Sequence, residues 1–235
     1  MTEATLTIVA TCNGVEVPDA PILGPRMIEA MNNHRYERQE IECGLAVIPK
    51  GARILEMGAG AGVVGAVLAK NCAPVSILSI EANPGLLPHI NRLYAHNGLQ
   101  DLISVRHAVV FSAPDAPGTV TFNVAGNFLG SSLTELPGKK TRAVEVPVLR
   151  YSDLTKEYPH DTIMMDIEGG ELDFLRHADL SGVNLVILEM HRDAYGREGM
   201  QEIRNLFLDK GFTLNEEQSK VGVHIWCRLM GPDQG

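Results

Sequence analysis

Acidic residues and one histidine follow two apolar runs in the second half of the chain. Asp166 and Glu168 come after the run TIMM, and Glu189 and His191 come after the run NLVIL. A carboxylate that ends a buried strand needs a partner, and an imidazole of near-neutral pKa beside carboxylates can accept the proton of a hydroxyl group. The same oxygen-rich set could hold a divalent cation. The spacing is not diagnostic, and we expect proton transfer with no bound metal.

A glycine-rich stretch, ARILEMGAGAGVVG, lies earlier in the chain and can be read in two ways. Gly60, Gly62 and Gly65 give G-x-G-x-x-G, the fingerprint of dinucleotide enzymes. A second reading starts at Glu56 and Gly58 and gives E-x-G-x-G-x-G, which is typical of the nucleotide loop of S-adenosylmethionine (SAM) methyltransferases. In either reading the glycines let backbone amides and a helix N-terminus approach a ligand closely.

Two carboxylates near this loop bear on the identity of the ligand. Glu56, at the end of the first predicted core strand, would repel a diphosphate but would face the cationic amino-acid end of SAM. Glu81 ends the second strand, where an acidic residue accepts hydrogen bonds from ribose hydroxyls of either ligand. Ala82, His107 and Ala108 follow the second and third strands, where adenine would lie. The pattern favours SAM.

Composition indicates a globular enzyme that acts on a small or weakly charged substrate. The chain has 235 residues, is 45% hydrophobic and carries a formal net charge of −9. Binding of nucleic acid through its phosphates needs a surplus of Lys and Arg, which this chain lacks. No stretch approaches the roughly 18 apolar residues of a membrane span, and the first residues lack the basic segment of a secretory signal. We expect a cytoplasmic protein with no nucleic-acid or membrane partner, and the sequence leaves open whether it is a homo-oligomer.

The elements that must position these residues alternate between strands and helices. Beyond Gly51 the sequence predicts a strand at 53–57, a helix at 62–70, a strand at 75–80, a helix at 84–96 and a strand at 103–108. The alternation resumes with a strand at 162–165, a helix from 171, a strand at 184–190, a helix at 199–210 and an antiparallel hairpin of 212–214 with 221–229. Such alternation is typical of a parallel sheet covered on both faces.

Two regions add to this pattern. Asn13 and Gly14 predict a turn between strands at 5–12 and 15–17, and one or two helices follow within 27–45. This hairpin and helical cap would occupy 1–50, ahead of a methyltransferase-like unit at 51–235, in one compact domain. Alternating stretches at 119–124 and 141–149 predict an antiparallel pair inserted around 111–150, with the loop 126–140 at its tip shaping an acceptor pocket.

Several motifs resemble those of FkbM-type SAM-dependent methyltransferases. The segments DIEGGE and LEMH resemble the DxEGxE and E-x-H motifs of that family, and EANPG, HNGL and RYERQE occur in the matching upstream places. The resemblance covers roughly residue 36 to the C-terminus. The chain departs from the family where Glu56 replaces the usual Asp, where Gly60 stands in place of a common Asn, and where Met165 replaces a frequent Lys.

The resemblance implies an α/β, Rossmann-like SAM methyltransferase fold with a seven-stranded, mostly parallel sheet. It implies SAM as the cofactor and O-methylation of a hydroxyl on a small metabolite, sugar or natural product, with N-methylation left open. Tyr36 and Glu37 would close over the amino-acid end of SAM. Gly58, Gly60 and Gly62 would bind the cofactor, together with Asp166 at the crevice where open α/β sheets hold ligands.

Two other interpretations remain open. A nicotinamide-dependent oxidoreductase would use the G-x-G-x-x-G fingerprint and would give no role to Glu56 or to DIEGGE. A non-catalytic SAM-binding protein would use the inserted region 111–150 as a binding surface, and its function would tolerate the loss of Asp166 and His191.

Overall fold

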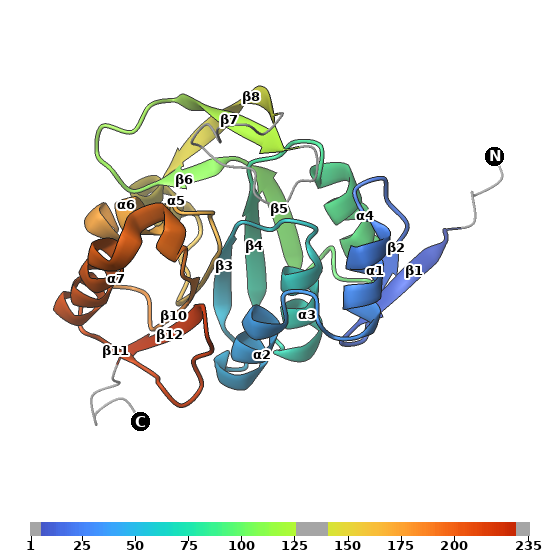
Figure 1. Cartoon of the computed structure of the whole chain (residues 1–235), viewed down its shortest axis with the longest axis horizontal. Coiled ribbons are helices and arrows are strands. Elements are labelled where there is room, and N and C mark those ends of the chain that lie inside the picture. The colour runs from blue at the N-terminus through green and yellow to red at the C-terminus, as the bar shows by residue number, and fades with distance from the viewer. Residues whose placement is uncertain (1–5, 126–140, 229–235) are drawn as a thin grey trace.

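The computed structural model describes residues 6–125 and 141–228, and its centre is a seven-stranded sheet (Figure 1). The strands in spatial order are β11 (Phe212–Leu214), β12 (Val223–Arg228), β10 (Leu185–Glu189), β9 (Thr162–Met165), β3 (Arg53–Met57), β4 (Ser76–Glu81) and β5 (Ile103–His107). The five strands from β10 to β5 are parallel, and β12 is antiparallel to both β10 and β11. The predicted sheet and its C-terminal hairpin are therefore confirmed.

Helices cover both faces of this sheet, as the buried strands require. One face carries α2 (Arg38–Val47), α3 (Val63–Asn71) and α4 (Leu87–His96), and the other carries α5 (Tyr151–Glu157), α6 (Glu171–His177) and α7 (Arg192–Asp209). Successive strand residues point to opposite faces, so Ile54 packs with the first set of helices and Leu55 with the second. Because the five strands are parallel, their carboxyl ends lie at the same edge of the sheet, beside the starts of several helices.

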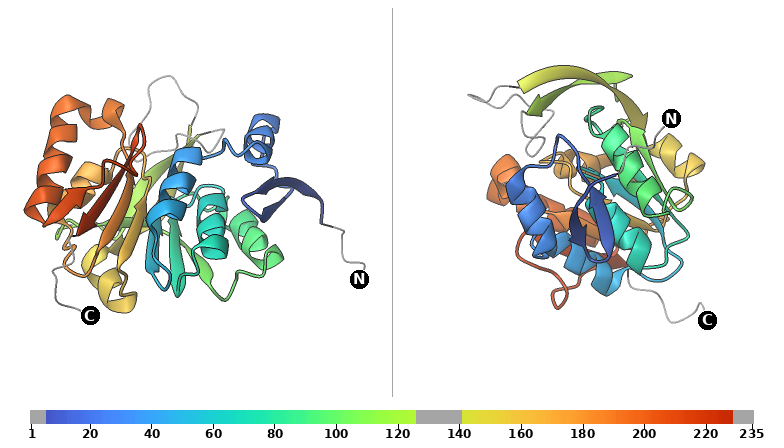
Figure 2. Two further views of the ribbon diagram at one scale, coloured as in Figure 1. Left: turned by 90° about the horizontal axis from the view of Figure 1, so that it is seen from below. Right: turned by 90° about the vertical axis from the view of Figure 1, so that its right-hand side faces the viewer.

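The predicted N-terminal hairpin is present as β1 (Ile8–Cys12) and β2 (Val15–Pro18), followed by α1 (Pro25–Asn32). Asn13 and Gly14 both have positive φ, at 44° and 83°, as the predicted turn requires. Cys12 and Val15 are buried in the same hydrophobic cluster as α3 and α4. Figures 1 and 2 show this hairpin and the β11–β12 hairpin at opposite ends of the molecule.

The predicted insertion forms a three-stranded sheet. β7 (Thr119–Ala125) and β8 (Thr141–Arg150) are antiparallel, as expected, and β6 (Val109–Phe111) pairs with β8 in parallel. β6 was not predicted because it follows β5 after a single residue, which makes the two strands look like one apolar run. The predicted tip loop, 126–140, lies outside the described residues.

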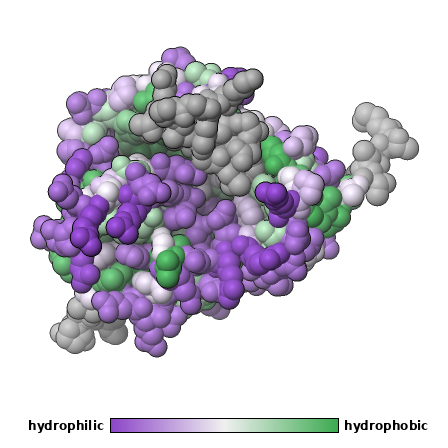
Figure 3. All heavy atoms as spheres, viewed as in Figure 1, coloured by the Kyte–Doolittle hydropathy of each residue, from purple (hydrophilic) through white to green (hydrophobic). Residues whose placement is uncertain are grey.

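Two helices differ from the prediction. The sequence analysis did not identify α5, a helix of seven residues without a strong apolar period. α7 begins at Arg192 instead of 199, and Gly196 (φ 64°, ψ −170°) introduces a kink inside it. Among the residues described, no helix has the length and apolar character needed to cross a bilayer. On the face seen in Figure 3, hydrophilic side chains predominate and hydrophobic residues form small, separate patches.

Candidate active site

A cavity of about 410 Å³ lies beside the carboxyl ends of the parallel strands. Its wall includes ten of the residues predicted to form the site: Tyr36, Glu37, Glu56, Gly58, Gly60, Glu81, Ala82, Ala108, Asp166 and Glu168. The cavity also has an aromatic wall, which the sequence analysis missed because its members, Phe111, Phe122 and Phe174, come from three separate elements. Gly62, His107, Glu189 and His191 are not part of the wall.

The glycine loop between β3 and α3 packs directly against the end of β9. The backbone N–H groups of Gly58 and Ala59 donate to the carbonyl of Ile80 at 3.0 and 3.1 Å. Gly58 has a φ of 91°, and a Cβ there would overlap the backbone carbonyl of Asp166. Gly62 instead begins α3 with a φ of 76° and faces Ile90 of α4. Gly58 therefore shapes the cavity, whereas Gly62 supports helix packing.

Glu81 is held at the cavity wall by backbone donors. Its two oxygens accept hydrogen bonds from Gly60 N–H at 2.8 Å and from Asn83 N–H at 2.7 Å. Burial raises the pKa of Glu81 to about 7. Each carboxylate oxygen can accept a further hydrogen bond, so the predicted contact with ribose hydroxyls fits this arrangement. His107 is outside the wall, with Nε2 3.1 Å from the carbonyl of Ala82, and so supports the turn after β4.

Glu56 lines the cavity, but its carboxyl group already has partners within the protein. Because strand residues alternate, Glu56 lies on the α3 face of the sheet, where the Ser79 hydroxyl and the Gly65 N–H donate to it. A Cβ at Gly65 would overlap the carboxyl group of Glu56. Burial raises the pKa of Glu56 to about 7. The protein itself thus supplies the partners of this carboxyl, and Gly65 is a packing residue that completes the dinucleotide pattern by coincidence.

Carboxylates from three elements meet on the other side of the loop. One oxygen each from Glu40, Asp166 and Glu189 lies within 4.8 Å of the others. Glu40 is 5% exposed, and Oδ1 of Asp166 is buried with no hydrogen-bond partner in the described part of the chain. Burial raises the pKa of both carboxyls well above the usual range, and the neighbouring carboxylates add to the rise. Such a set can hold a cation, either an ammonium group or a metal ion.

Glu40 was missed by the sequence analysis, although a signal was present. It lies in the first turn of α2, shortly after Tyr36 and Glu37, and all three residues line the cavity. Glu37 precedes the helix with a φ of 39°. The signal was the closeness of Glu40 in sequence to Tyr36 and Glu37, which were predicted to bind the cofactor.

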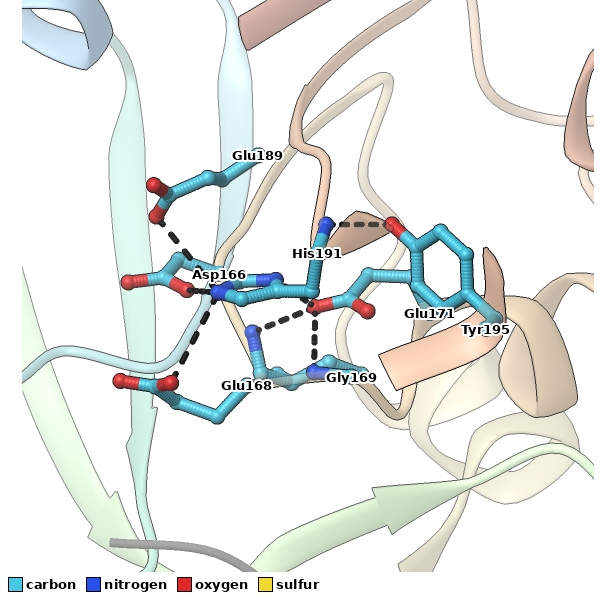
Figure 4. Close-up of polar contacts among 8 residues, drawn as sticks. Asp166, Glu168, Gly169, Glu171, Glu189, His191 and Tyr195 are labelled. Carbon is cyan, nitrogen blue, oxygen red and sulfur yellow. Dashed lines mark hydrogen bonds and ion pairs between the residues drawn. The ribbon is translucent and has the colours of Figure 1, made fainter. Parts of the chain in front are cut away.

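His191 lies behind the cavity wall, between two groups of carboxylates (Figure 4). Its Nε2 faces Asp166 at 3.5 Å, Glu168 at 3.7 Å and Glu189 at 4.0 Å. Its Nδ1 is 3.0 Å from Oε1 of Glu171. The structure thus brings together the four residues predicted to do chemistry and adds a fifth.

The pKa of His191 differs from the near-neutral value that the sequence analysis expected. Burial of the ring lowers this pKa, but the hydrogen bond and charge of Glu171, with the charges of Asp166 and Glu189, outweigh that effect and raise it to about 9. The imidazole is therefore protonated at neutral pH in this state of the protein. It accepts a proton only after losing the one it carries.

Comparisons with known proteins decide between the readings of the glycine loop. The sequence profile of the methyltransferase FkbM domain matches residues 56–214, which include the loop, Asp166 and His191. The chain belongs to the FkbM methyltransferase family. The family and fold of this methyltransferase imply SAM as the methyl donor, which agrees with the E-x-G-x-G-x-G interpretation of the loop. No curated protein sequence matches the chain.

Several solved structures resemble this chain at low sequence identity. An uncharacterised protein from Listeria monocytogenes serotype 4b is 16% identical, with a TM-score of 0.50 over 83% of this chain and 69% of its own. The precorrin-6y C5,15-methyltransferase of Geobacter metallireducens is 13% identical, with a TM-score of 0.47 over 93% and 95%. The m1A22 tRNA methyltransferase of B. subtilis is 14% identical, with a TM-score of 0.47 over 80% and 64%. Identities this low bear on the fold alone.

Proposed function

We propose that this FkbM methyltransferase transfers a methyl group from SAM to a hydroxyl group of a small molecule. The observation that carries the proposal is the position of Asp166. Asp166 lines the cavity beside the glycine loop and also faces Nε2 of His191 at 3.5 Å. A ligand in the cavity would therefore meet a carboxylate that has a second proton-binding group directly behind it.

The residues of the cavity fit the cofactor. Gly58 and Gly60 let the chain approach closely, and Glu81 offers acceptor capacity to ribose hydroxyls. Glu40 has no cationic partner among the described residues of the wall, and Asp166 faces only the His191 ring behind it, so both carboxyls are placed to receive the cationic amino-acid end of SAM.

The wall also suggests the class of acceptor. Phe111, Phe122 and Phe174 offer an apolar surface, while Glu168 and Asp166 offer negative charge. A phosphate-rich acceptor would be repelled by these carboxylates, so a small neutral molecule fits better than a nucleic acid.

SAM supplies an activated methyl group on a sulfonium, so the protein mainly needs to orient the acceptor and receive its proton. Asp166 is the carboxylate that can accept this proton at the cavity wall, and His191 can take it on through Nε2. The pKa of His191 is about 9 and the pKa of Asp166 is raised. The pair therefore binds a proton tightly after His191 has lost the proton that it carries at neutral pH. Turnover should therefore increase with pH towards about 9.

Isothermal titration calorimetry with S-adenosylhomocysteine and with NAD tests the choice of cofactor. We expect heat of binding with S-adenosylhomocysteine and none with NAD. Absence of binding to S-adenosylhomocysteine would contradict the proposal.

Transfer of labelled methyl groups from SAM to metabolite extracts, with total RNA assayed in parallel, tests the acceptor class. We expect label in small molecules that is stable to mild acid and base, as an ether is. Label confined to RNA would overturn the small-molecule assignment. Label attached to an amine nitrogen would show that the acceptor is an amine and not a hydroxyl group.

A further inference from the structure

Glu171, the last residue of DIEGGE, is fully buried at 0% exposure and contacts the back of the His191 ring. We infer that Glu171 is the positioning residue of the proton-transfer pair: it fixes the tautomer of His191 and holds the turn that carries Asp166 and Glu168. The inference deepens the proposed function and rests on it for the chemical role. The tautomer itself can be measured without any activity.

One oxygen of Glu171 joins the turn to the histidine. Oε1 accepts hydrogen bonds from the backbone N–H groups of Ile167 at 3.1 Å and Gly169 at 3.2 Å, and the same oxygen is 3.0 Å from Nδ1 of His191. The turn is tight: Glu168 has a φ of 54° and Gly169 a φ of 100°. A movement of Glu171 would therefore displace the carboxylates at the wall and the ring behind them together.

The chemistry of the partners sets the tautomer. A carboxylate accepts hydrogen bonds and donates none, so Nδ1 must carry the hydrogen that Glu171 receives. The lone pair of the neutral ring is then on Nε2, which faces Asp166 and Glu168 from the turn and Glu189 from the end of β10. On the other side, Tyr195 of α7 accepts a hydrogen bond from the backbone N–H of His191 at 2.6 Å and fixes the main chain. Proton exchange is thereby confined to the nitrogen that faces the active-site carboxylates.

Stabilisation of the N-terminus of α6 does not by itself explain the burial of Glu171. Carboxylates in the first turn of a helix are favourable, but an exposed one serves this purpose, as Asp173 does in the same turn with a side chain that is 84% exposed. Burying a carboxylate is unfavourable unless donors surround it. All three donors of Glu171 reach Oε1 and come from the turn after β9 and from His191, while Oε2 is buried with no hydrogen-bond partner among the described residues. The partners that this carboxyl has therefore tie its burial to the site.

Glu171→Gln tests the inference because Gln keeps an oxygen that can accept hydrogen bonds but removes the charge. Imidazole ¹⁵N shifts are recorded in histidine-labelled protein, and the His191 signals are assigned by their absence in His191→Asn. In the wild type above pH 9 we expect Nδ1 protonated and Nε2 unprotonated. In Glu171→Gln we expect the pKa of His191 to fall, the two tautomers to mix, and kcat to drop by about tenfold to a hundredfold, the size of effect seen when a hydrogen-bond partner that orients a functional histidine is changed. The KM for SAM should change little.

Asp153→Asn is the matched control, because Asp153 lies in the first turn of α5 and is exposed. It should leave the His191 titration and kcat unchanged. An Nε2-protonated neutral ring in the wild type would overturn the inference, as would an unchanged His191 titration in a folded Glu171→Gln protein. The wild-type tautomer remains decisive even if the variant does not fold. A wild-type protein with the expected tautomer but no methyl transfer would contradict the proposed function alone.

Discussion

Two sets of carboxyl groups lie at or directly beside the cavity and differ in what surrounds them. Glu56 and Glu81, on the glycine-loop side, receive hydrogen bonds from a hydroxyl and from backbone N–H groups. Glu40, Asp166 and Glu189, on the other side, face one another. We call these the donor-supplied set and the donor-poor set.

The difference separates carboxyls that build the protein from carboxyls that await a ligand. A buried charge is tolerated when donors satisfy it and is costly when they do not. The donor-supplied set has its hydrogen-bond donors within the protein, and Glu81 keeps acceptor capacity for a ligand. The donor-poor set needs a proton or a cation, which agrees with the raised pKa values of Glu40 and Asp166 and with the position of His191 beside them.

The largest effect should come from His191→Asn, which removes the proton-binding nitrogen next to the donor-poor set. The Asn amide can still donate a hydrogen bond to Glu171, so the turn should remain in place. We expect kcat to fall by about a hundredfold or more, within the usual range for loss of a general base. Because a base must be unprotonated to act, the wild-type rate should rise towards about pH 9, and this rise should disappear in the variant.

Steady-state rates across pH, with the affinity for S-adenosylhomocysteine measured in parallel, check this prediction. His89→Asn is a suitable control, since His89 lies on α4 and does not line the cavity. A variant that keeps the wild-type rate and pH profile would remove His191 from the mechanism. A variant that loses cofactor affinity instead would assign His191 to binding.

The next effect concerns the donor-supplied set and is a change in stability. The pKa of Glu56 rises from 4.5 to about 7 on folding, so the folded protein holds this proton more tightly than the unfolded chain does. The free energy of unfolding should therefore fall as pH rises through that window, by on the order of 3 kcal/mol, since one pKa unit corresponds to about 1.4 kcal/mol. In Glu56→Gln this part of the fall should be absent.

Urea unfolding at about pH 5 and about pH 8 measures the difference between the two proteins. Glu202→Gln, at an exposed position paired with Arg176, serves as a control for loss of one carboxylate. Equal pH dependence in the wild type and Glu56→Gln would contradict the assignment of Glu56 to the buried, donor-supplied set.

Much of the fold could be predicted because its signals are local. Short apolar runs separated by helical segments indicated the parallel sheet, and Asn13 with Gly14 indicated the N-terminal turn. β6 and α5 escaped because neither has a local boundary: β6 continues from β5 after one residue, and α5 is too short to show a period. Boundaries that depend on which neighbour a strand pairs with are set by tertiary contacts.

The site was predicted less completely, because side-chain direction and burial are not visible in a motif. The sequence placed Glu56 near the cofactor, and Glu56 does line the cavity, but the motif did not show that Gly65 and Ser79 would contact its carboxyl group. The expected near-neutral pKa of His191 was wrong because it depends on Glu171, whose position at a helix start suggested a simpler role. The sequence thus indicated which residues lie at the carboxyl ends of the strands. It did not indicate which residues from other elements, such as Glu40 and Glu171, contact them.

The smallest effect should come from Glu40→Gln, and it compares the two sets directly. Glu40 belongs to the donor-poor set, so its loss should weaken the binding of a cationic ligand. We expect the affinity for S-adenosylhomocysteine, which retains the ammonium group, to fall about fivefold, equivalent to about 1 kcal/mol. The same calorimetric titration on Glu56→Gln should show a smaller loss, because the Glu56 carboxyl faces Ser79 and α3. The opposite ranking would mean that the cation binds to the donor-supplied set, and the distinction between the two sides of the cavity would fail.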